Sequence, residues 1–142
     1  MTAFFIDGLA ALPFLLWLVA VELRRRRAQP TASLIRAALC AIAVSYLLAH
    51  LNRWLRLWPG RPDFPSGHVT FASCCWYALA LLDRRFALLG LPLLGVLAYA
   101  LVAAGWHGRL DVAGGFVLGS LAMAAFGGAY RRERASTESS QR

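Results

Sequence analysis

The sequence predicts an all-α integral membrane protein, a helical bundle with about five transmembrane helices. Its composition is the first reason, because 59% of the 142 residues are hydrophobic and only 15% are charged. Soluble domains carry about a quarter charged residues, and a chain this short cannot hide so much apolar surface from water. The composition therefore favours lipid as the surrounding solvent.

Five apolar stretches are the second reason. A spanning helix needs roughly 20 residues, with a range of about 17 to 25. The stretches cover residues 4–23, 33–51, 66–82, 86–106 and 112–130. The third is the shortest, but it opens with Ser66 after Pro65, and a serine side chain can cap unpaired N–H groups at a helix start. Short connections between the stretches predict antiparallel neighbours.

The arginines are the third reason. The net charge of +8 would suggest nucleic acid in a soluble protein. Here all fifteen cationic residues are arginine, and eight of them form clusters at 24–27, 84–85 and 131–132. The clusters follow the first, third and fifth stretches, so the positive-inside rule places them in the cytoplasm. The sequence predicts contact with membrane lipid, no nucleic-acid partner, an inner or plasma membrane, and connections 52–65 and 106–111 on the outer face.

One transmembrane domain is expected over residues 1–130, followed by a polar, low-complexity cytoplasmic tail over 131–142 that we expect to be disordered. The first stretch lacks a basic leader and a cleavage site, so it is expected to remain as an anchor. Cys40, Cys74 and Cys75 are expected to be small buried thiols. Gly115 and Gly119 form a small-xxx-small pair, which predicts close helix packing.

Polar residues that could bind an anion or take part in catalysis lie on the first outer connection. His68 follows Ser66 and Gly67 at an expected helix start, where unpaired N–H groups and the positive end of the helix dipole favour an anion. Arg61, just upstream, can offer paired donors to phosphate oxygens. Asp63 is expected to cap the same helix.

His107 and Asp111 lie on the second outer connection. They are four residues apart, so they share a face if the helix reaches them. A carboxylate that holds one imidazole nitrogen leaves the other free as a nucleophile, and His68 can supply a proton. Two alternatives stay open. The histidines can be interfacial residues bonded to backbone or water, or they can join Asp63 and Asp111 around zinc or iron, which the nearby arginines disfavour.

These residues resemble known motifs. RP at 61–62, PSGH at 65–68 and HGRLD at 107–111 are similar to the three signature motifs of the type 2 phosphatidic acid phosphatase superfamily, which includes lipid phosphate phosphatases and vanadium haloperoxidases. The resemblance covers about residues 46–119. It implies hydrolysis of a phosphate monoester or diphosphate on a lipid, at the outer face, with no metal and no cofactor.

Roles for single residues also follow from this resemblance. His107 would attack phosphorus and form a phosphohistidine, Asp111 would orient that imidazole, and His68 would protonate the leaving oxygen. The phosphoryl oxygens would be held by Arg61 and by the backbone amides near Ser66 and Gly67.

The chain departs from the family pattern at two cations. Trp54 stands where the pattern has lysine, and Leu101 stands where it has the arginine of the third motif. Each charge-assisted hydrogen bond is worth about 1.5 to 3 kcal/mol, so replacements are needed for turnover. Arg109 is the first candidate.

Two other arginines, Arg53 and Arg56, are the remaining candidates for replacement. If no cation compensates, the alternative is a catalytically impaired member that binds lipid phosphate or serves as a scaffold. The family usually has six spans, whereas five are expected here, with the missing one near the amino end. This expectation leaves closure of the bundle through a homo-oligomer open.

Overall fold

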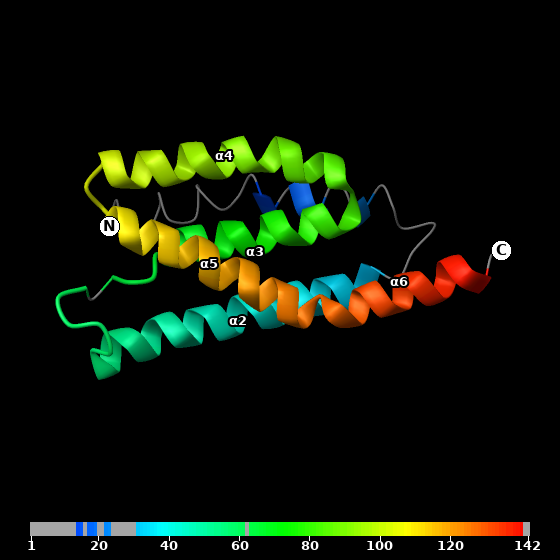
Figure 1. Cartoon of the computed structure of the whole chain (residues 1–142), viewed down its shortest axis with the longest axis horizontal. Coiled ribbons are helices and arrows are strands. Elements are labelled where there is room, and N and C mark those ends of the chain that lie inside the picture. The colour runs from blue at the N-terminus through cyan, green and yellow to red at the C-terminus, as the bar shows by residue number, and fades with distance from the viewer. Residues whose placement is uncertain (1–13, 16, 20–21, 24–30, 62, 141–142) are drawn as a thin grey trace.

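The computed structural model is helical and describes residues 14–15, 17–19, 22–23, 31–61 and 63–140. Its helices are α2 (Thr31–Leu55), α3 (Gly67–Leu82), α4 (Arg84–Ala103), α5 (Arg109–Phe126) and α6 (Gly128–Ser140). The described part of the chain contains no strand. Helices α2 to α5 alternate in direction and pack side by side, while α6 extends beyond them (Figure 1). The prediction of an all-α bundle is confirmed.

Three helices are long and apolar enough to cross a membrane, over Ala32–Leu55, Arg84–Ala103 and Arg109–Phe126. Helix α3 is apolar but has only 16 residues, which at 1.5 Å per residue is about 24 Å, short of a hydrocarbon core of about 30 Å. It contacts α2, α4 and α5, so its neighbours surround it. The fold is that of a helical membrane bundle. Most of the expected first span, 4–23, lies outside the described residues.

Helices α3 and α5 approach each other at glycines. A Cβ atom added to Gly115 would lie 2.6 Å from the carbonyl oxygen of Ser66, and one added to Gly119 would overlap the carbonyl oxygen of Thr70. Backbones this close are typical of membrane helices that pack through small residues. The predicted packing role of Gly115 and Gly119 is therefore confirmed.

The buried core lies between α2, α3 and α5 on one side of the bundle and between α3 and α4 on the other. Cys74 and Cys75 are buried in it, as predicted. The prediction for Cys40 is wrong, because this thiol is exposed. It lies beside Leu39 on an outward face of α2, where an apolar side chain meets lipid in a membrane bundle.

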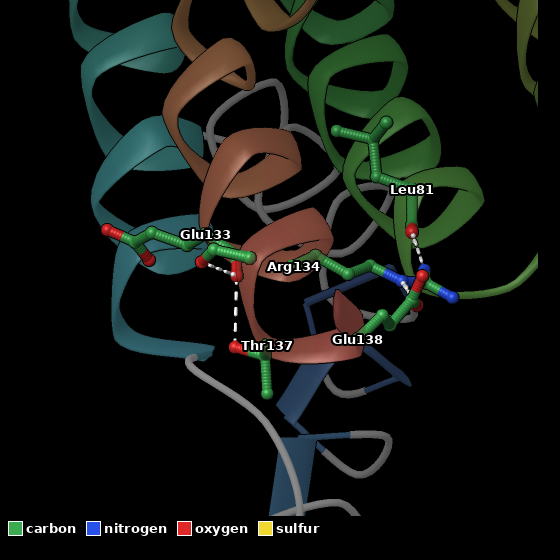
Figure 2. Close-up of polar contacts among 6 residues, drawn as sticks. Leu81, Glu133, Arg134, Thr137 and Glu138 are labelled. Atoms are coloured by element: carbon green, nitrogen blue, oxygen red, sulfur yellow. Dashed lines mark hydrogen bonds and ion pairs between the residues drawn. The ribbon is translucent and has the colours of Figure 1, made fainter. Parts of the chain in front are cut away.

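The carboxyl-terminal region is helical, so the expectation of disorder is wrong over residues 131–140. The expected last stretch, 112–130, is divided at Gly127, and α6 continues to Ser140. Tyr130 is fully buried. Figure 2 shows that Arg134 donates to the carbonyl oxygen of Leu81 (3.1 Å) and to Glu138 (2.9 Å).

Arg134 explains why a polar sequence is ordered here. The Leu81 carbonyl belongs to the last turn of α3, where backbone acceptors have no partner inside the helix, and a basic side chain can satisfy them. The hydrogen bond to Glu138 raises the pKa of Arg134 above its ordinary value, so the arginine keeps its charge. Within α6, Thr137 also donates to the carbonyl oxygen of Glu133 (3.0 Å) (Figure 2).

The glycine contact between α3 and α5 can be tested by adding one methyl group. Gly119→Ala is expected to lower the free energy of unfolding by about 1 to 3 kcal/mol, because the methyl group meets backbone that cannot move aside. Gly95→Ala is the matched control, since a Cβ there meets nothing within 4 Å. Thermal unfolding in detergent measures both. Equal melting temperatures for the two variants would contradict this packing.

Candidate functional site

The two connections that carry the predicted residues lie at the same end of the bundle. Helices α2 and α4 end there, and α3 and α5 begin there, while α6 lies at the opposite end (Figure 1). The connections are joined directly, because the Ser66 N–H donates to the carbonyl oxygen of Asp111 (2.8 Å). The structure therefore brings the two predicted groups of residues into one site.

The two histidines of the site face each other. Their ring centroids are 5.6 Å apart and their planes meet at 64°. His68 is the second residue of α3, and His107 lies in the turn before α5; both are half-buried. A nucleophile must come within about 3 to 3.5 Å of the atom that it attacks, and a proton donor within hydrogen-bond reach of the leaving atom. The two imidazoles are close enough for one small group to contact both rings.

Asp111 is held at the start of α5 in a way that the sequence did not predict. The helix begins at Arg109, so His107 lies outside it and does not share a helical face with Asp111. The reason is local, because Gly105 adopts a positive φ of 72° and Gly108 is the N-cap. The Asp111 carboxylate accepts the Gly108 N–H (2.8 Å), as an acid three residues after an N-cap often does.

Arg61 reaches the same carboxylate. Its Nη1 lies 3.6 Å from Oδ1 of Asp111, and Asp111 is only 8% exposed. The loop that carries Arg61 is itself ordered by backbone bonds, since the Arg61 N–H donates to Trp58 (3.1 Å) and its carbonyl accepts from Phe64 (3.3 Å). The guanidinium therefore lies beside Asp111 and close to Gly108.

Ser66 is the N-cap of α3 by position, but its side chain makes no capping hydrogen bond. The predicted cap is therefore wrong for Ser66. Its Oγ is fully buried and has no hydrogen-bond partner among the described residues, while its N–H is taken by Asp111. The amide of the half-buried Gly67, the first residue of α3, is thus the next backbone donor available to an anion.

Asp63 does not cap α3 either. Its carboxylate pairs with Arg53 across 3.2 Å, and both side chains are more than half exposed, at 55% and 61%. The metal alternative needed Asp63 and Asp111 together with the two histidines. Each carboxylate instead lies beside an arginine, and the described residues contain no group of three metal-ligating side chains.

No positive charge stands at the two departures from the family pattern. Trp54 is 81% exposed at the end of α2, and Leu101 is 5% exposed in the core of α4. Among the candidate replacements, Arg53 is paired with Asp63 and Arg56 lies in the loop after α2. Arg109 is exposed at the start of α5 and makes no ion pair with any described residue.

Two residues that hold the site together were missed in the sequence. The buried Asn52 of α2 donates from its side-chain amide to the carbonyl oxygen of Phe64, and Gly114 of α5 lies against the Phe64 ring. An amide side chain within the candidate membrane span of α2 was the available signal, since polar groups in such helices are expensive and usually serve a purpose.

The polar contacts of Asp111 predict a stability effect. Asp111→Ala is expected to lower the free energy of unfolding by about 1 to 3 kcal/mol, because it removes the Gly108 cap and leaves Arg61 without its carboxylate. Asp63→Ala is the control, since its exposed ion pair contributes about 0 to 1 kcal/mol. Thermal unfolding of both variants decides. A loss at Asp63 as large as that at Asp111 would contradict the interpretation.

Comparison with known proteins adds an independent observation. A family model described as the PAP2 superfamily matches residues 45–134, which is more than half of the chain. The match begins inside α2 and ends inside α6, so it spans both histidines, Arg61 and Asp111. No curated protein and no solved structure matches the chain.

Proposed function

The chain belongs to the PAP2 superfamily, whose members are generally phosphatases, and from this premise we propose that it hydrolyses a phosphate monoester or diphosphate on a membrane lipid. The observation that carries the proposal is the pair of imidazoles, 5.6 Å apart, beside the contact between Arg61 and Asp111. A nucleophile, a proton donor, an orienting carboxylate and an anion-binding cation are the parts that such a reaction needs.

The reaction proceeds in two steps through these side chains. A ring nitrogen of His107 attacks phosphorus, the bond between phosphorus and the lipid oxygen breaks, and His68 donates its proton to that oxygen. A phosphohistidine is left on His107. Water then attacks the phosphorus while His68 takes the proton from it, and free phosphate leaves with His107 restored. Asp111 acts by orienting His107.

In this proposal, positively charged or hydrogen-bond-donating groups of the site bind the phosphoryl oxygens. Arg61 supplies a guanidinium with several donors, and the start of α3 supplies the amide of Gly67 and the positive end of the helix dipole. The buried hydroxyl of Ser66 can donate a further hydrogen bond. No metal and no other cofactor enters the proposed mechanism.

A lipid substrate is supported by where the site lies. It stands at one end of a bundle that has three helices apolar enough to span a membrane, so a phosphate on a lipid headgroup would approach it from the bilayer surface. The arginine-rich starts of α4 and α6 are at the opposite end. By the positive-inside rule, we place the site on the outer face of an inner or plasma membrane.

Loss of the nucleophile is the direct test of turnover. Full-length protein in detergent, supplied with phosphatidic acid or a polyprenyl diphosphate and a metal chelator, is expected to release phosphate. His107→Ala is expected to abolish release, and His68→Ala to slow it most for poor leaving groups. His50→Ala is the matched control, because His50 lies exposed on α2. Full, chelator-resistant activity in His107→Ala would refute the mechanism.

A non-catalytic role in binding lipid phosphate is the second candidate, because Trp54 and Leu101 replace two cations of the family pattern. The charge of Arg109 separates the two functions. Arg109→Ala is expected to weaken both vanadate inhibition and rate by about tenfold, the effect of losing one charge-assisted hydrogen bond. Arg53→Ala and Arg56→Ala are the comparison variants.

The outcomes of this experiment differ clearly. If all three arginine variants kept the rate and the vanadate sensitivity of the unmodified protein, compensation by these residues would be excluded. Vanadate binding without any release of phosphate by the unmodified protein would favour the binding function over the enzyme.

A further inference from the structure

Phe64 contacts three parts of the site, although it lies outside the quoted motifs. Its carbonyl oxygen accepts the side-chain amide of Asn52, from α2. Its ring lies 4.8 Å from the ring of Trp58, centroid to centroid and tilted by 34°. On the other side the ring lies against Gly114 of α5, where a Cβ atom would overlap ring carbons. Phe64 is thus held by α2, by the loop and by α5.

The chain next to Phe64 is also fastened to α5. Two residues on, the Ser66 N–H donates to the Asp111 carbonyl (2.8 Å), and the Ser66 carbonyl lies against Gly115. The three α5 residues, Asp111, Gly114 and Gly115, occupy adjacent turns of one helix. Residues 64–66 therefore form a strap that fixes the start of α3 to the start of α5.

This strap determines where His68 lies relative to His107. His68 follows Ser66 by two residues, and His107 precedes Asp111 by four. Further along the helices, Cys74 donates to the Gly119 carbonyl (3.4 Å). At the end that carries the histidines, the bulky ring of Phe64 against Gly114 is the side-chain contact that resists sliding of residues 64–66 along α5. Packed interiors transmit such constraints because they contain few voids.

We propose that Phe64 is a positioning residue that sets the separation of the two imidazoles, with Asn52 and Gly114 as its supports. It does not touch the reacting atoms; it acts through the strap. A misplacement of about 1 Å in such a site can cost about 100-fold in rate. The effect on rate rests on the proposed function, whereas the effect on the two rings does not.

Gly114→Ala tests the slot, with Gly95→Ala as the control because that position is open. The kcat at saturating phosphatidic acid is expected to fall about 100-fold with little change in KM. The nuclear Overhauser effect between the ring protons of His68 and His107, measured on the full-length protein in detergent micelles, is expected to weaken in the same variant. Gly95→Ala is expected to change neither quantity.

Two further variants separate positioning from folding. Gly114→Ala alone is expected to lower the melting temperature through the overlap with the Phe64 ring. Phe64→Leu combined with Gly114→Ala removes that overlap, so the melting temperature is expected to return towards the wild-type value while kcat and the cross-ring signal stay low. Asn52→Leu keeps the side-chain volume but removes the donor to Phe64, and it is expected to weaken the cross-ring signal without introducing a clash.

The proposal is overturned if Gly114→Ala and Asn52→Leu both keep the wild-type cross-ring signal, or if the unmodified protein shows no such signal. A kcat within twofold of wild type in both variants would also overturn it. If the unmodified protein releases no phosphate, the proposed enzymatic function fails, and the cross-ring signal of the variants alone decides whether Phe64 positions the two rings.

Discussion

The close approach of α3 and α5 is the constraint on which the site depends. Gly115 and Gly119 remove the side chains that would separate the two helices, so the backbone of Ser66 can bond to the backbone of Asp111. Without that contact the two connections would end at the same face but at no fixed distance. His68 and His107 lie close together because α3 and α5 pack closely. The helices can pack closely because Gly115 and Gly119 have no side chains.

The same close approach of α3 and α5 explains the charge arrangement of the site. Asp111 is nearly buried, and a buried carboxylate is costly unless hydrogen bonds and a countercharge compensate for lost water. The Gly108 amide and the Arg61 guanidinium supply that compensation. Under the proposed function, a phosphate that attracted Arg61 would draw it from Asp111 and leave the carboxylate free to orient His107. Anion binding and the orientation of His107 would then be linked through one arginine.

Much of the architecture followed from composition, because apolar stretches of spanning length and the glycine pair leave few other folds. The proximity of the candidate site residues could be predicted because their motifs fall on two connections that antiparallel helices bring to one end. The predictions that failed concerned groups for which another local partner competed. The N-cap role expected of Ser66 lost to its backbone bond with Asp111, Asp63 found Arg53 instead of a helix start, and α5 began late enough to exclude His107.

Tertiary contacts account for the remaining differences. The polar composition of the segment after Tyr130 predicts disorder. In the structure, the buried ring of Tyr130 and the Arg134 guanidinium on the Leu81 carbonyl attach this segment to the bundle as part of α6. The sequence signal of Asn52, an amide in a membrane-spanning helix, does not say which group it binds. Its meaning comes from Phe64, twelve residues away along the chain, which only the fold brings into reach.

The departures at Trp54 and Leu101 change what the remaining charges must do. Backbone amides and the helix dipole at the start of α3 are preorganised donors, but they carry only partial positive charge. Phosphoryl transfer needs positive charge that meets the negative charge where it develops. Under the proposed function, that requirement would fall on the full charges of Arg61, which lies beside Asp111, and of Arg109, which makes no ion pair with any described residue.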